Sequence, residues 1–243
     1  MTDFRESHHL PLEGRDPADP AGLPRQRRGV TPQMHGRYPD YDVLEQAGHW
    51  DEVTRRVVLG RVENVPPIRF FEPQEARTLE VFCDVVMHQD AEPRIAVLNY
   101  IDERLHQGKL DGYQYEGMPD DGETWRIVAR TLDEEAHRLG LERFRDGDWE
   151  QCKEIVRRFA HGNLELGIDC KHAWAVVSRM ILSAYYAHPW AWNEIGFGGP
   201  AYPRGYSRFG SPHLGVEAET EEWEGHEAFA VDPVRDVQER GLE

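Results

Sequence analysis

Two Glu-x-x-His pairs have a spacing that could support metal chemistry, Glu103 with His106 and Glu134 with His137. Such pairs on two helices of a bundle supply ligands to di-iron and dimanganese carboxylate sites. At about 100° per residue, however, Glu103 and Glu134 lie nearly opposite the apolar stripes of their predicted helices, whereas bundle ligands must point inward. We therefore interpret the pairs as solvent-facing residues. If the four side chains instead face the core of a bundle, the chain would be a stand-alone helical di-iron or manganese carboxylate protein, and we keep this possibility as an alternative function.

Other signatures of catalysis or cofactor binding are missing from the sequence. The remaining histidines form no H-E-x-x-H motif, and there is no G-x-G-x-x-G after a strand, no Walker loop and no G-x-S-x-G motif. Cys83, Cys152 and Cys170 have no C-x-x-C spacing and are too few for a four-cysteine iron–sulfur cluster or zinc site. We expect reduced thiols, and no catalytic residue, metal or cofactor in this chain.

The composition is that of an acidic, soluble globular protein. Of 243 residues, 39% are apolar and 30% are charged, and the formal net charge is -17. No run of about 20 apolar residues, the length needed to cross a bilayer, is present. A negative charge of this size repels phosphate backbones. We therefore expect neither a membrane span nor a nucleic-acid partner.

Apolar residues recur at three- and four-residue steps from residue 42 onward, which predicts amphipathic helices. One helix is predicted from Asp42 to Val62 and a second from Pro73 to Val86. Four more are predicted to end at Gly108, Gly140, Gly162 and near Tyr186. Because no period-two strand or Asn-Gly hairpin is found, the predicted fold class is all-α, with about six helices in a single irregular domain.

The flanking regions divide the chain into three predicted parts. Residues 1–40 contain six prolines and six arginines without apolar periodicity, which is typical of an extended arm. Residues 41–187 form the predicted helical domain, and residues 188–243 form a non-regular segment with an acidic tail. Arg27-Arg28 is not followed by an apolar stretch or a cleavage site, so no export signal is predicted.

Residues 188–206, the aromatic segment, interleave five aromatic side chains with four glycines and three prolines. Aromatic and arginine residues dominate the energetics of protein interfaces. The segment is therefore predicted to bind a partner, although it could instead cap the helices of this same chain. The predicted partner-binding residues are His188, Trp190, Trp192, Phe197, Tyr202, Arg204 and Tyr206.

Several motifs, in a fixed order, resemble the gluconate 2-dehydrogenase subunit 3 family over roughly residues 66 to 206. They are Phe70-Phe71, the helix with Glu75 and Leu79, Cys83-Asp84, Tyr100-Ile101-Asp102 with Leu105, His188-Pro189, Gly196-Phe197-x-Gly199-Pro200 and Gly205-Tyr206. The glycine, proline and aromatic motifs after the helices are the most distinctive of these.

The resemblance implies a small, helical accessory subunit of a flavin-dependent sugar or alcohol dehydrogenase. Its partner would be a large subunit of the glucose-methanol-choline (GMC) oxidoreductase type, which carries FAD and catalysis, so no catalytic residue transfers to this chain. Many members of the family carry a twin-arginine signal, whereas this chain has the arm and an added helix from Asp42 to Val62. We therefore expect a cytoplasmic complex, or one exported with a partner that carries the signal.

Overall fold

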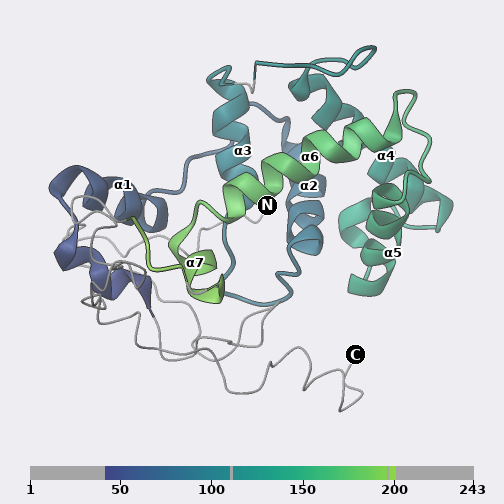
Figure 1. Cartoon of the computed structure of the whole chain (residues 1–243). Coiled ribbons are helices and arrows are strands. Elements are labelled where there is room, and N and C mark those ends of the chain that lie inside the picture. The colour runs from purple at the N-terminus through teal and green to yellow at the C-terminus, as the bar shows by residue number, and fades with distance from the viewer. Residues whose placement is uncertain (1–41, 110–111, 196, 201–243) are drawn as a thin grey trace, which may run out of the picture. The chain divides into compact units, whose positions relative to one another are not determined.

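The computed structural model describes residues 42–109, 112–195 and 197–200 (Figure 1). Every regular element in these ranges is a helix, which confirms the predicted all-α class. None of these helices combines the length and the apolar character needed to cross a membrane. The predicted arm, the acidic tail, Tyr202, Arg204 and Tyr206 lie outside the described residues.

The described residues divide into two units, each of which is described here by itself. The first unit comprises residues 65–109 and 112–185, and the second comprises residues 42–64, 186–195 and 197–200. The first unit contains α2 (Pro73–Val86), α3 (Val97–His106), α4 (Asp121–Arg138), the 3-10 helix η3 (Phe144–Asp146), α5 (Trp149–Ala160) and α6 (Cys170–Tyr185). The second unit contains the 3-10 helix η2 (Val43–His49), α1 (Glu52–Glu63) and α7 (Pro189–Ile195).

The core of the first unit forms where α2 and α6 each pack against α3, α4 and α5. Phe82 of α2 is fully buried at its centre. Its ring centroid lies 6.2 Å from that of Trp125, 6.0 Å from that of Phe159 and 6.4 Å from that of Trp174. One aromatic cluster therefore joins α2 with α4, α5 and α6.

The helices of the first unit begin and end with local signals in the sequence. The Asp120 and Asp148 carboxylates accept hydrogen bonds from the third backbone N–H of α4 and α5, respectively. The predicted C-terminal glycines Gly108, Gly140 and Gly162 all have positive φ. Each follows its helix and permits the left-handed turn that pairs the last carbonyl groups.

The start of α2 is held by a buried carboxylate of α3. Asp102 accepts hydrogen bonds from the backbone N–H groups of Arg69, Phe70 and Phe71 at 2.6, 2.9 and 3.0 Å. Two sequence motifs that are about 30 residues apart, Phe70-Phe71 and Tyr100-Ile101-Asp102, are thus parts of a single structural contact.

The second unit differs from its predicted secondary structure in two places. The single helix expected from Asp42 to Val62 is interrupted, because the chain is extended at Trp50 and Asp51, and Asp51 then caps α1 by accepting from the Thr54 N–H. The aromatic segment was predicted to be non-regular, yet it begins with the short helix α7. Its Pro189 occupies the first helical position, where proline is well tolerated.

Candidate partner-binding segment

His188 fixes the start of α7 in the second unit. Its backbone carbonyl accepts from the Ala191 N–H at 3.0 Å, and its Nδ1 accepts from the Trp190 N–H at 3.2 Å. The imidazole also lies edge-on to the Trp190 ring, with 4.8 Å between centroids. The His188-Pro189 pair therefore acts as a cap followed by a favoured first helical residue. This start signal for a helix is not evident from the glycine and proline content of the segment, which predicts non-regular structure.

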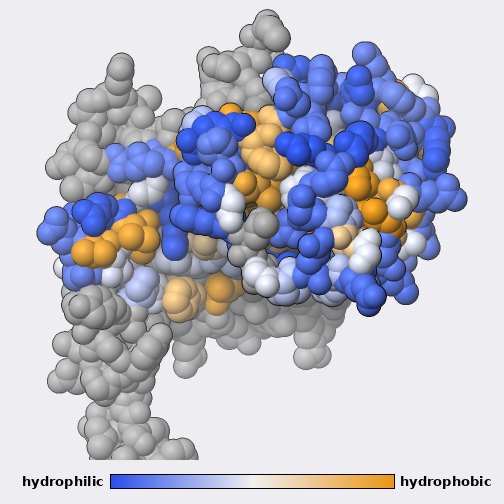
Figure 2. Space-filling model, turned by 90° about the horizontal axis from the view of Figure 1, so that it is seen from above, coloured by the Kyte–Doolittle hydropathy of each residue, from blue (hydrophilic) through white to orange (hydrophobic). Residues whose placement is uncertain are grey.

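The described part of the aromatic segment combines buried and exposed aromatic side chains. His188, Trp190 and Trp192 are buried, whereas Phe197 is 42% exposed, and the neighbouring Ile195 is 44% exposed. Figure 2 shows hydrophilic residues around several hydrophobic groups on the face seen from above. Among the predicted contact residues that the structure describes, Phe197 is thus the one open to a partner.

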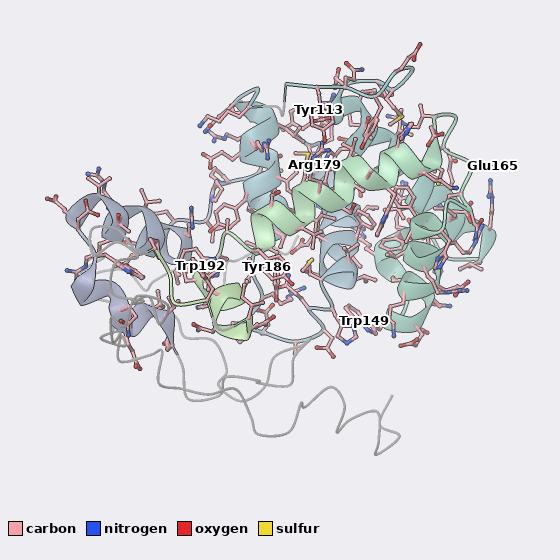
Figure 3. All side chains as sticks on the ribbon, in the orientation of Figure 1. Tyr113, Trp149, Glu165, Arg179, Tyr186 and Trp192 are labelled. Atoms are coloured by element: carbon pink, nitrogen blue, oxygen red, sulfur yellow. The ribbon has the colours of Figure 1, made fainter. Side chains whose placement is uncertain are left out.

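Arg61 of α1 contacts both the residue before the aromatic segment and an indole within it. Its Nη1 donates a hydrogen bond to the Ala187 carbonyl oxygen at 2.7 Å, and its guanidinium carbon lies 5.6 Å from the centroid of the Trp192 ring. The Trp192 indole N–H in turn donates to the carbonyl of Tyr186 at 2.7 Å (Figure 3). The guanidinium therefore contacts both the chain that enters α7 and an indole within it.

Asn193 connects α7 with the start of η2. Its Oδ1 accepts from the Val43 N–H at 2.8 Å, and its Nδ2 donates to the Asp42 carboxylate at 3.4 Å. Both Asn193 and Asp42 are buried. Because buried polar groups are costly unless they are paired, this arrangement favours one register of η2 against α7.

Gly199 lies close to the same side of the unit. Its φ is +83°, and a Cβ added there would lie 3.0 Å both from Trp50 Cζ2 and from Val43 Cγ2. Such distances are shorter than ordinary van der Waals contact. Glycine is therefore favoured at this position by both conformation and space.

Tyr186, which precedes α7, has a pKa that argues against a role as a general base. The pKa of Tyr186 is raised from its usual 10.0, first by burial and then by the nearby negative charge of Glu194. Both effects disfavour the phenolate. Tyr186 therefore stays protonated at neutral pH and is a poor general base.

The structure does not bring the two Glu-x-x-His pairs together as a metal site. Glu103 accepts hydrogen bonds from Arg69 and Gln107, and His137 Nε2 contacts the carbonyl of Glu142. His106 and Glu134 are exposed. Within residues 42–109, 112–195 and 197–200, no three His, Cys, Asp or Glu side chains are grouped so that they could hold a metal ion.

Cys152 is a structural thiol of the first unit. It is buried, and its Sγ donates to the carbonyl of Phe144 at 3.2 Å. Burial, with a smaller contribution from the charge of Asp148, raises its pKa to about 11. Because the thiolate is the nucleophilic form, Cys152 is unreactive at neutral pH.

Comparison with known proteins gives a family match. The family model described as Gluconate 2-dehydrogenase subunit 3 matches residues 73–199, slightly more than half of the chain. The match begins at the first residue of α2 and ends at Gly199, so it includes α2 to α6 and α7 but not η2 or α1. No curated protein and no solved structure matches the chain.

Proposed function

Because this chain belongs to the gluconate 2-dehydrogenase subunit 3 family, we propose that it is a non-catalytic small subunit of a dehydrogenase complex. It binds and stabilises a catalytic large subunit of the GMC type, which carries FAD and oxidises a sugar or an alcohol. The observation that carries this proposal is the family match over residues 73–199, since the family is a subunit of a multi-subunit dehydrogenase.

The aromatic segment is the proposed contact with the catalytic subunit. Phe197 supports this assignment, because an exposed aromatic ring next to the exposed Ile195 offers apolar surface to a partner. Trp190 and Trp192 contribute indirectly to the proposed contact, since they are buried side chains of the helix that precedes Phe197. Tyr202, Arg204 and Tyr206 follow closely in the sequence and are proposed as further contacts.

Co-purification tests the proposed complex. An affinity-tagged full chain, purified from its native cell, should retain a GMC-type protein identified by mass spectrometry, and the complex should show a flavin absorption spectrum. The tagged chain purified alone should be colourless and should show no dehydrogenase turnover. A yellow, active preparation of this chain by itself would overturn the proposal.

Two alanine variants test the proposed contact against a structural role. Phe197→Ala should weaken binding of the co-purified flavoprotein by about 2 kcal/mol and, because its ring is 42% exposed and meets the Trp192 ring edge-on, should cost the free chain only about 1 kcal/mol of stability. Trp190→Ala should instead cost about 3 to 5 kcal/mol of folding stability, because a large buried ring is removed. Leu139→Ala, at a half-exposed leucine of the first unit, is the matched control and should change neither quantity. Normal binding by Phe197→Ala would remove Phe197 from the interface.

A further inference from the structure

Residues 42–64, the support segment, lie outside the part of the chain that matches the family. We propose that this segment holds residues 186–200 in their partner-binding conformation before the partner arrives, and that Arg61 is the main positioning residue. The inference rests on the proposed function of the aromatic segment. It adds a role for η2 and α1, which the family match leaves unexplained.

Residues 186–200 need external support because their own regular structure is short. α7 has seven residues, and isolated helices below about 12 residues are marginal in water. The Pro200 ring and the left-handed Gly199 end any helical continuation on its C-terminal side. Contacts with other elements must therefore supply much of the stability of this conformation.

The support segment contacts residues 186–200 at three separated points. Arg61 binds the Ala187 carbonyl oxygen and covers Trp192 before and within α7. The backbone N–H of Val43 and the carboxylate of Asp42 pair with Asn193 near the end of the helix. Gly199 fits against Trp50 and Val43 beyond it. Three points spread over 13 residues restrain the path of the backbone as well as its position.

Phe197 lies between the second and third of these contacts. Its N–H donates to the carbonyl of Trp192 at 2.9 Å, which ties its backbone to α7. Its ring is 42% exposed, so the partner would meet an aromatic group whose backbone N–H is already bound to α7. Fixing a contact residue before binding lowers the ordering entropy that association must overcome.

Arg61 is suited to positioning in a way that lysine is not. A guanidinium is planar and has several fixed N–H donors, so it can stack on an indole and donate to a carbonyl at the same time. Lysine would keep the positive charge but lose this combination. The pair Arg61→Met and Arg61→Lys therefore separates geometry from charge. Arg56→Met is the matched control, because Arg56 lies on the same helix and is exposed.

Amide hydrogen exchange on the full-length free chain is the first readout, and it does not depend on the partner. Arg61→Met and Arg61→Lys should both lower the fraction of free chains in which residues 186–199 are protected from exchange to about one tenth, with no change in α2 to α6. Gly199→Ala, which acts through a different contact, should give the same pattern, and Arg56→Met should match the wild type. Unchanged exchange in both Arg61 variants would overturn the proposal.

Binding of the flavoprotein that co-purifies with the wild-type chain is the second readout. If only a fraction of the free chain has the bound conformation, the apparent affinity for the partner is the intrinsic affinity multiplied by that fraction. We expect Arg61→Met to bind about tenfold more weakly, and Arg56→Met to bind normally. Faster exchange with unchanged binding would show that order in residues 186–200 is irrelevant to the partner, and would overturn the proposal. If the wild-type chain binds no flavoprotein, the proposed function fails, while the exchange experiment still tests the support segment.

Discussion

Both units bury apolar side chains, but the segments of the second unit are also joined by polar contacts between residues far apart in the sequence. In the first unit, apolar side chains from α2 to α6 meet around Phe82, and each helix has signals close to its own ends. In the second unit, single polar side chains join segments that are 126 and 150 residues apart in the sequence. The two units therefore differ in how far along the sequence their polar contacts reach.

The largest expected effect breaks the core of the first unit. Phe82→Ala removes a fully buried ring that touches three other aromatic residues, so it should lower the free energy of unfolding by about 3 to 5 kcal/mol. Urea denaturation followed by circular dichroism measures this loss. A cost below about 1 kcal/mol would show that the aromatic cluster is not the main stabilising element of the unit.

Asp102 tests how far the first unit also relies on a single polar side chain. Asp102→Ala leaves the N–H groups of residues 69–71, of which that of Phe71 is buried, without their acceptor and should cost about 3 kcal/mol. Asp102→Asn keeps one acceptor oxygen and should lose about half as much. Both values come from the same urea titration. If the alanine variant is as stable as the wild type, the buried carboxylate does not hold the start of α2.

The Cys152 thiol gives the first unit a pH dependence. Its pKa rises from 9.0 to about 11 because burial disfavours the thiolate. Between pH 9 and 11 the unfolded chain loses this proton while the folded chain keeps it, so stability should fall as pH rises, by about 2 kcal/mol in total. The comparison is with Cys152→Ala, in which this contribution should disappear. Parallel stability curves for the two proteins between pH 8 and 11 would contradict the assignment.

The smallest expected effect concerns His88, which ends α2 with φ of +52° where α3, α4 and α5 use glycine. The Gln89 N–H still pairs with the Asp84 carbonyl oxygen, as in the glycine-ended helices. His88→Gly relieves the left-handed strain but loses the ring contact with Trp149, so stability should change by less than about 1 kcal/mol. Thermal melting of the variant checks this value. A loss above 2 kcal/mol would give the imidazole a larger role than capping.

Local signals explain why the first unit was predictable from the sequence. Helical periodicity, aspartate caps and the three C-terminal glycines all act within a few residues, so they can be identified without knowing the fold. His88 was missed because a histidine in a left-handed turn has no distinctive pattern around it. The pairing of Asp102 with residues 69–71 was missed because a buried carboxylate and an exposed one look alike in sequence.

The second unit was harder to predict because its contacts are distant and polar. The valines at 53 and 57 seemed to continue one apolar stripe from residue 43, but they are more than half exposed, and Asp51 starts a new helix there. The glycines and prolines of the aromatic segment indicate non-regular structure, whereas Pro189 follows a histidine cap and begins α7. Composition identified the aromatic segment, but it could not separate the buried Trp190 and Trp192 from the exposed Phe197.

The most direct test of the central claim is the yield and thermal stability of the flavoprotein produced with and without this chain. With the full chain present, the flavoprotein should retain FAD, melt at a higher temperature and co-elute with the chain. The Phe197→Ala chain should reduce this stabilisation, and the Leu139→Ala chain should preserve it. A flavoprotein that is equally stable and active without the chain, and that elutes separately from it, would contradict the account.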